Sequence, residues 1–364
     1  MRGLYIHIPF CKQICSYCDF PKQVAKEDVQ KEYIHHLIEE IRSYKEELKD
    51  IQSVYIGGGT PNSISFNLLD QLFCEIAPIL KNSIENTIEI NSELLTKQQA
   101  LLFKKYNINR VSIGAQTFSE PLIKVIRRGH NFLIVKKAVE ILKEVGIQNI
   151  NIDMMYGLPN QTIEDLKLDL DQLFGLEPQH ISYYSLILEE KTILSYQIKH
   201  HQISLPDDDY VADMANYIAQ RLKKSKFRQY EISNYALKGY ESIHNIGYWK
   251  CEEYIGVGAG ACSYIHQFRI QNHVILKDYY AQYIKEKEWI SPMEAKKEYM
   301  LLGFRMIKGI SKEAYFKRFF SKIEDDFDLD KLYEKNLIEE TNEFIYIKED
   351  KLLLGNLVFE EILG

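Results

Sequence analysis

The feature that most constrains the fold is an alternation of short β-rich runs and amphipathic helical stretches over residues 4 to about 190. The helical stretches repeat apolar residues at spacings of three and four, as in Tyr33, Leu37, Ile41, Tyr44 and Leu48. Six such β-α units of roughly 30 residues predict a parallel sheet, whereas a closed eight-unit barrel needs about 250 residues. The chain is therefore predicted to be an α/β protein, an open (β/α)6 partial TIM barrel. The predicted strands are Leu4–Ile8, Ser53–Ile56, Thr87–Ile90, Arg110–Gly114, Asn149–Asp153 and His180–Leu186.

The alternation of predicted strands and helices changes after residue 190, and the sequence pattern changes again near residue 291. These two changes set the predicted domain boundaries. Residues 1–190 are the predicted partial barrel, residues 191–290 an extension of it, and residues 291–364 a small helical domain with a wing. Within the extension, Asp207–Lys224 is predicted to be one helix and Tyr230–His266 a loop-rich segment. Ser291 begins the last domain as a helix start with proline at the first helical position.

Composition and charge exclude several classes of protein. Hydrophobic residues make up 46 % of the chain and charged residues 27 %, which are ordinary globular values. The net charge of −7 argues against nucleic-acid binding through phosphate neutralisation. No apolar run approaches the roughly 18 residues of a membrane span, so no stable membrane insertion is expected; a transient membrane contact stays open. The start lacks a signal-peptide pattern, so the expected location is the cytoplasm, where thiols stay reduced.

Three of the six cysteines, Cys11, Cys15 and Cys18, form a CxxxCxxC cluster directly after the first predicted strand. A thiolate trio in a reducing compartment predicts a metal or cluster site. Structural zinc takes four protein ligands and no second cysteine pair is present, while a thioredoxin-like pair would not need Cys11. Three thiolates on a four-iron cluster would leave one iron open for a further ligand. An iron–sulfur cluster is therefore favoured over zinc.

This cysteine spacing after the first strand of a β-α barrel resembles the radical S-adenosylmethionine (SAM) superfamily. Four longer motifs resemble one group within it, the oxygen-independent coproporphyrinogen oxidases, which contains a HemN-type dehydrogenase branch and a HemW-type haem-chaperone branch. The resemblance runs nearly from end to end. It implies a 4Fe–4S cluster on the three cysteines, with SAM on the open iron. The four motifs are Tyr5–Cys11 (YIHIPFC), Ile56–Pro61 (IGGGTP), Ser112–Gln116 (SIGAQ) and Asp153–Pro159 (DMMYGLP).

The resemblance also assigns residues to SAM. Polar residues at the carboxyl ends of successive barrel strands favour a convergent site in any case. By resemblance, Glu89 holds the SAM ammonium, and Gln116, Arg128 and Asp153 contact its carboxylate or ribose; the neighbouring Arg127 leaves the choice of arginine open. The remaining SAM-contacting residues implied are Tyr5, Tyr17, Gly57, Gly58, Gly59 and Thr60. A second glycine run, Gly256–Ala261, matches a dinucleotide pattern only superficially, because it has no preceding long strand.

The segment His244–Trp249 (HNIGYW) is the strongest signal in the second half. It is predicted to lie in a polar loop. Imidazole is a common ligand of haem iron, and aromatic rings pack on a flat macrocycle. The string resembles the haem-binding motif proposed for the chaperone branch, which makes His244, Asn245, Tyr248 and Trp249 candidate haem-contacting residues. Alternative ligands in the same region are Cys251, Cys262 and His266.

Two functions follow from the resemblance. Phe20 stands where the dehydrogenase has a fourth cysteine, and only ten residues precede Cys11, where the dehydrogenase has a longer extension. Both features favour a haem chaperone that passes haem to an apo-haemoprotein, for which a respiratory haem protein is one candidate. The alternative is oxidative decarboxylation of coproporphyrinogen III to protoporphyrinogen IX. No catalytic residue is assigned, and whether the chain is an enzyme stays open.

Overall fold

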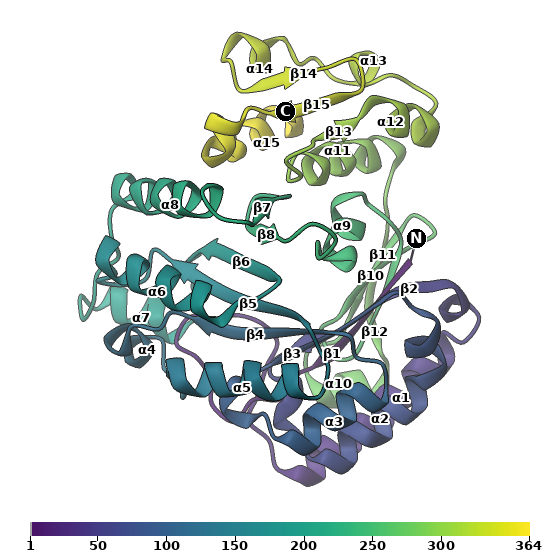
Figure 1. Ribbon diagram of the computed structural model, residues 1–364. Coiled ribbons are helices and arrows are strands. Elements are labelled where there is room, and N and C mark those ends of the chain that lie inside the picture. The colour runs from purple at the N-terminus through teal and green to yellow at the C-terminus, as the bar shows by residue number, and fades with distance from the viewer. Residues whose placement is uncertain (1) are drawn as a thin grey trace.

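The computed structural model describes residues 2–364, and within this range twelve strands form one mixed sheet (Figure 1). Strands β1 to β6 lie at its centre in sequence order, and each neighbouring pair is parallel. This order confirms the predicted open (β/α)6 partial barrel, in which all six carboxyl ends face the same way. The strands are β1 (Arg2–Ile8), β2 (Ile51–Gly58), β3 (Glu85–Ile90), β4 (Arg110–Gln116), β5 (Asn149–Tyr156) and β6 (His180–Ser185).

Helices connect the central strands and cover the outer face of the sheet (Figure 1). Thr96 and Thr162 begin two of them with complete capping boxes. The apolar stripe from Tyr33 to Leu48 does not form one continuous helix, because the helix ends at Ser43 and a short 3-10 turn (η1, Glu47–Asp50) carries Leu48. The helices are α1 (Glu27–Ser43), α2 (Phe66–Asn82), α3 (Lys97–Lys105), α4 (Glu120–Val125), α5 (Phe132–Glu144) and α6 (Ile163–Leu176).

The main hydrophobic core lies between the outer face of the sheet and these helices. Ile6 and Val54 of the sheet and Leu37 and Leu72 of the helices are fully buried in it. Alternation along each strand turns the other face inward, where polar residues such as Ser112 are buried instead. A polar inner face is the surface on which a barrel of this kind builds a site.

Residues 191–290 extend the sheet at both ends. On one side β8 pairs antiparallel with β6, and on the other β9 pairs parallel with β1. The segment predicted as loop-rich, Tyr230–His266, also contains β8, α9, β9 and β10, which the sequence did not predict. The domain boundary at residue 190 stays a prediction, since the same sheet continues beyond it. The elements are α7 (Ile193–Lys199), α8 (Asp208–Lys223), β7 (Arg228–Gln229), β8 (Asn234–Ala236), α9 (Ile243–Trp249), β9 (Tyr254–Val257), β10 (Cys262–Ile265), β11 (Phe268–Asn272), α10 (Leu276–Ala281) and β12 (Ile284–Trp289).

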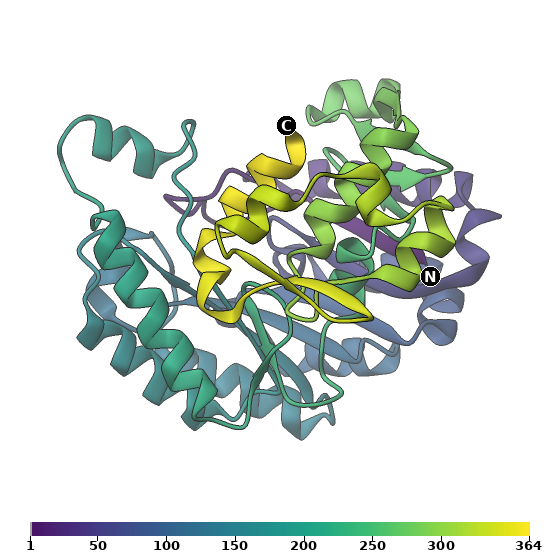
Figure 2. The same cartoon turned by 90° about the horizontal axis from the view of Figure 1, so that it is seen from above.

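The C-terminal residues form a small domain with a separate hydrophobic cluster and an antiparallel sheet in the order β13-β15-β14. Figures 1 and 2 show it lying over the partial barrel, and Figure 1 shows α9 between the two. This confirms the predicted small helical domain with a wing. Nowhere in residues 2–364 is there a helix with the length and apolarity needed to cross a bilayer. The elements are α11 (Pro292–Gly303), β13 (Ile310–Ser311), α12 (Lys312–Phe319), α13 (Ile323–Asp326), α14 (Asp330–Glu334), β14 (Ile338–Glu340), β15 (Phe344–Ile347) and α15 (Gly355–Leu363).

Candidate functional site

The three cysteines predicted to hold a cluster lie on the loop that follows β1, at the carboxyl end of the sheet. Cys11 is buried and its Sγ accepts a hydrogen bond from Thr60 Oγ1 at 3.5 Å, while Cys15 and Cys18 are partly exposed. All are free thiols, and among residues 2–364 no three metal-ligating side chains converge on one point. The structure therefore places the thiols on one loop without a preformed ligand set, and cluster binding by these residues stays a prediction.

The cationic side chains of Lys22 and Arg128 lie beside this loop. Burial raises the pKa of the Cys11 thiol, and it raises the pKa of Cys18 to about 11, while the Lys22 ammonium opposes both shifts. Arg128 Nη1 lies 3.6 Å from Cys15 Sγ and donates to it. Because the thiolate is the form that binds metal, positive groups beside the thiols are what such a site requires.

The glycine-rich segment after β2 packs directly on the cysteine loop. Gly59 N donates to Ile8 O at 2.9 Å, and Thr60 N donates to Phe10 O at 2.8 Å. A Cβ on Gly59 would lie 2.9 Å from Cys11 Sγ, so no larger residue fits there. The close approach of the two loops therefore explains why glycine stands at position 59. Contact of Gly57, Gly58, Gly59 and Thr60 with SAM stays a prediction.

Glu89 is a partly buried carboxylate on the inner face of β3. It accepts hydrogen bonds from Tyr55 OH at 2.8 Å and from Gly58 N at 3.1 Å. Burial raises the pKa of the Glu89 carboxyl to about 7, and the nearby Asp153 adds to the shift. A cation bound beside Glu89 would favour its charged form again, so the site suits an ammonium group.

Gln116 and Arg128 present unsatisfied polar atoms at the carboxyl end of β4. Gln116 Oε1 and Arg128 Nε are buried without a hydrogen-bond partner among the described residues. Gln116 also has a left-handed φ of +62°, which is strained for a residue with a side chain. Arg128 Nη2 donates to Gly114 O, whereas Arg127 is exposed. Orphaned buried polar atoms favour a ligand with complementary groups, so these residues fit the polar end of SAM.

Asp153 and the two tyrosines complete the predicted SAM set. Asp153 is oriented by Ser112 Oγ and Asn151 Nδ2, each donating at 2.7 Å. The Tyr5 hydroxyl shares a hydrogen bond of 2.9 Å with His7 Nδ1, so Tyr5 also has a local packing role. Tyr17 packs on a small apolar cluster formed by Leu122, Ile126, Met155 and Leu158.

The HNIGYW segment forms the short helix α9 rather than the predicted polar loop. Ser242 caps the helix, and its side chain accepts from Asn245 N. The carboxylate of Glu85 on β3 accepts from Ile243 N and His244 N, each at 3.0 Å. An acidic side chain at a helix start satisfies backbone N–H groups that the helix leaves unpaired. The prediction of a loop was wrong because this acceptor lies far away in the sequence.

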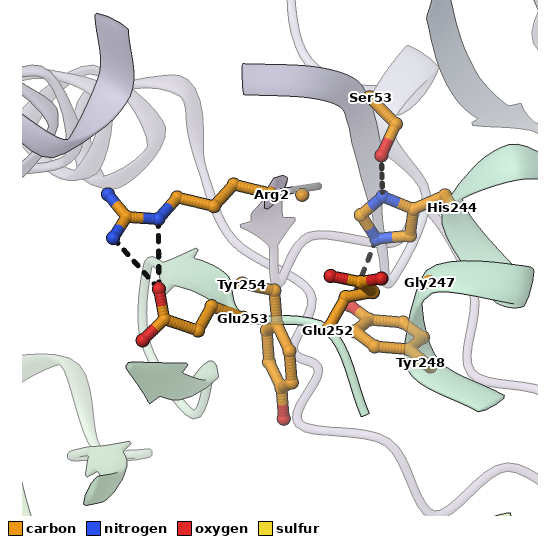
Figure 3. A pocket seen from close by; sticks show the side chains of 9 residues that line it. Arg2, Ser53, His244, Gly247, Tyr248, Glu252, Glu253 and Tyr254 are labelled. Carbon is orange, nitrogen blue, oxygen red and sulfur yellow. Dashed lines mark hydrogen bonds and ion pairs between the residues drawn. The ribbon is translucent and has the colours of Figure 1, made fainter. Parts of the chain in front are cut away.

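His244 is buried, and both ring nitrogens are hydrogen-bonded. Nδ1 bonds with Ser53 Oγ and Nε2 with Tyr248 OH, each at 2.9 Å (Figure 3). The ring stacks on Tyr55 at a centroid distance of 5.2 Å. Burial lowers the pKa of His244 to about 3, and Arg110 adds to the shift, so the imidazole is neutral. A neutral imidazole is the form that binds iron, but both of its nitrogens are engaged here.

Trp249 faces the C-terminal domain. The guanidinium of Arg305 lies over the ring of Trp249, 4.6 Å from its centroid. Trp249 Nε1 is buried and has no hydrogen-bond partner within residues 2–364. The helix therefore joins the barrel through His244 and Tyr248 and the C-terminal domain through Trp249.

The two predicted sites lie at opposite ends of the barrel. The cysteine loop, Glu89 and Asp153 belong to the carboxyl half of the strands, whereas His244 rests on their amino ends. A Cβ on Gly3, at the start of β1, would lie 3.0 Å from His244 Cε1. The structure thus brings the residues predicted to contact SAM together and separates them from the predicted haem ligand.

Sequence reasoning missed the inner-face residues that support this site. Tyr55 and Asn151 each stand two positions before a predicted site residue, Gly57 and Asp153. Residues two apart on a strand share a face, so this spacing could have marked them. No local signal marks Glu85, because its partners lie about 160 residues away on α9.

The partial barrel, with three cysteines after its first strand and polar groups at the strand ends, is the architecture of the radical SAM class. A family model described as the radical SAM superfamily matches residues 5–173. The chain is 38 % identical over 371 residues to "Heme chaperone HemW" of Lactococcus lactis, covering 100 % of this chain and 97 % of the relative. It is 35 % identical to "Heme chaperone HemW" of Bacillus subtilis, covering 100 % of both. The chain therefore belongs to the HemW family of the radical SAM superfamily.

The solved structures include a close match of fold. Coproporphyrinogen III oxidase (HemN) from Escherichia coli, described as a radical SAM enzyme, superposes with a TM-score of 0.84. The match covers 99 % of this chain and 89 % of that structure at 19 % identity, which establishes the fold alone. Membership of the radical SAM superfamily implies a 4Fe–4S cluster and SAM as cofactors.

Proposed function

We propose that this protein is a haem chaperone, which binds haem and transfers it to an apo-haemoprotein. The observation that carries the proposal is the identity of 38 % and 35 % to two proteins named as haem chaperones, each matched along the whole of this chain. Phe20, which is 62 % exposed beside the cysteine loop, supports the same branch because the dehydrogenase has cysteine there. The acceptor is a haemoprotein, with respiratory proteins as candidates, and the expected location is the cytoplasm.

The proposed cofactor sites follow the geometry of the barrel end. Cys11, Cys15 and Cys18 would hold the cluster, which supplies one electron able to cleave the sulfonium of SAM. Glu89 would receive the SAM ammonium, and the unpaired atoms of Gln116 and Arg128 would meet its polar groups. Tyr5, Tyr17, Gly57–Thr60 and Asp153 would complete the pocket.

The proposed haem site is His244 with Asn245, Tyr248 and Trp249. His244 is 3 % exposed and its ring nitrogens bond with Ser53 of β2 and Tyr248 of α9, so iron reaches the ring only after one of these two contacts opens. Cys251, Cys262 and His266 stay the alternative ligands. Cys251 is itself buried, and its carbonyl accepts from Arg318 Nη2 at 2.9 Å.

The test is a haem titration beside an anaerobic turnover assay. Wild-type protein is expected to form a roughly stoichiometric haem complex with a shifted Soret band, and to return coproporphyrinogen III unchanged with SAM and a reductant. His244→Ala should lose or alter the band, because it removes the imidazole. Multiple turnovers to protoporphyrinogen IX would instead establish the dehydrogenase. An unaltered haem spectrum in His244→Ala would reject this ligand and leave the three alternatives.

A further inference from the structure

A continuous line of hydrogen bonds runs through the barrel from helix α9 to Asp153. Ser242 N, at the start of α9, donates to Tyr230 OH at 3.2 Å. The Tyr230 hydroxyl bonds with His180 Nε2 at 2.8 Å, and His180 Nδ1 bonds with Asn151 Oδ1 at 2.6 Å. Asn151 Nδ2 then donates to Asp153 Oδ1 at 2.7 Å. Four hydrogen bonds therefore join the HNIGYW helix to a residue predicted to contact SAM.

The direction of this line is fixed at both ends. A backbone N–H such as that of Ser242 can only donate, and Asn151 donates through Nδ2 to Asp153, so its Oδ1 accepts from His180. Tyr230 therefore gives its proton to His180 Nε2, and His180 carries its own proton on Nδ1, facing Asn151. Burial holds the pKa of His180 well below its usual value, so the ring is neutral and has this single tautomer. Each bond of the line therefore has one donor and one acceptor, and Asn151 also bonds with Ser112 and Ser182.

We propose that Tyr230, His180 and Asn151 are positioning residues that hold Asp153 in its SAM-binding orientation from helix α9, and that haem held by His244 consequently weakens SAM binding. The second half of this proposal rests on the proposed function. Because binding free energies are reciprocal, SAM weakens haem binding by the same factor.

The sign of this linkage follows from burial. His244 Nδ1, in a ring that is 3 % exposed, bonds with Ser53 Oγ of β2, so the iron of haem reaches this nitrogen only if α9 leaves the strand ends. Such a movement separates Ser242 N from Tyr230 and breaks the line at its first bond. A second contact acts in the same sense, since Tyr55 stacks on His244 and donates to Glu89. The position of α9 that buries His244 therefore supports both carboxylates that are predicted to bind SAM, those of Glu89 and Asp153.

The positioning role is tested without haem, on anaerobic protein with a reconstituted cluster. Tyr230→Phe removes one hydroxyl and is expected to weaken SAM binding roughly three- to ten-fold in equilibrium dialysis, with iron content unchanged. Tyr217→Phe is the matched control, because its hydroxyl accepts from Arg221 on the outer helix α8 and should leave SAM affinity unaltered. If Tyr230→Phe does not fold, Asn151→Ala breaks the same line beside Asp153.

A double-mutant cycle separates positioning from a general structural effect. In an Asp153→Asn background, Tyr230→Phe should change SAM affinity less than about two-fold, because the group that it positions is altered already. An equal loss in both backgrounds overturns the positioning role. An Asp153→Asn variant with wild-type SAM affinity overturns it as well.

The linkage is tested by repeating the SAM measurement with haem at saturation. Wild-type protein should bind SAM more weakly with haem than without it, and Tyr230→Phe should show a smaller difference. Haem binding that leaves SAM affinity unchanged overturns the linkage. Absence of haem binding overturns the proposed function and the linkage together, while the cycle still decides the positioning role.

Discussion

At the scale of single residues, local sequence spacing identified which residues belong to the candidate site, but it did not predict what their side chains contact. The cysteine pattern and the strand-end residues could be identified because their signals lie within a few positions of one another. The choice of Arg128 over Arg127 required the structure, where Arg128 reaches Cys15 and Arg127 is exposed. The surroundings of His244 could not be predicted, since Ser53, its hydrogen-bond partner, is 191 residues away.

The cysteine trio gives the first residue-scale prediction. Cys11→Ala, Cys15→Ala and Cys18→Ala should each abolish the 4Fe–4S cluster in anaerobically reconstituted protein. Three thiolates bind three of the four irons, and the loss of one thiolate leaves two irons without a protein ligand. Iron and sulfide analysis with electron paramagnetic resonance measures the cluster. Cys74→Ala is the control, since this exposed cysteine lies on α2 and outside the loop. A requirement for Cys74 as strict as for the trio would contradict the assignment.

Glu89 gives a second prediction, on pH dependence. Its pKa in the folded protein is raised to about 7, so its contribution to stability is present below its ordinary pKa of 4.5 and is lost as pH rises through 7. Glu89→Gln cannot ionise and should therefore gain stability relative to wild type between pH 5 and pH 8, by at most about 3 kcal/mol. Urea unfolding of SAM-free protein at both pH values measures the difference. A difference that does not change with pH would contradict the raised pKa.

At the scale of elements, strands and capped helices were predictable, and elements held by distant contacts were not. All six predicted central strands are present, because their apolar runs and flanking turns are local signals. The helix predicted to reach Leu48 ends at Ser43, since the following 3-10 turn also buries its apolar residue and so continues the periodicity. Helix α9 was missed because His-Asn-Ile-Gly is a weak helix former, and Glu85 of β3 stabilises its first turn.

At the scale of the whole molecule, the second half of the chain closes one side of the barrel through contacts that no local pattern reveals. Strand β9 lies parallel to β1, although the two are about 250 residues apart. The glycine run Gly256–Ala261 covers the end of β9 and the turn to β10, and a Cβ on Gly256, within β9, would lie 1.9 Å from Cys262 O. Close packing therefore accounts for this glycine, and the dinucleotide pattern is coincidental.

One buried carboxylate joins these distant parts and gives the last prediction. Glu40 of α1 is 1 % exposed and accepts from Gly258 N at 2.7 Å and from Asn272 Nδ2 and Tyr279 OH, each at 2.6 Å. Glu40→Ala leaves these donors short of an acceptor, so it should lower the free energy of unfolding by about 3 kcal/mol. The midpoint of urea unfolding measures the loss. Glu39→Ala on the same helix removes an exposed carboxylate and should change stability by no more than about 0.5 kcal/mol. Equal effects of the two variants would show that Glu40 does not join α1 to the second half of the chain.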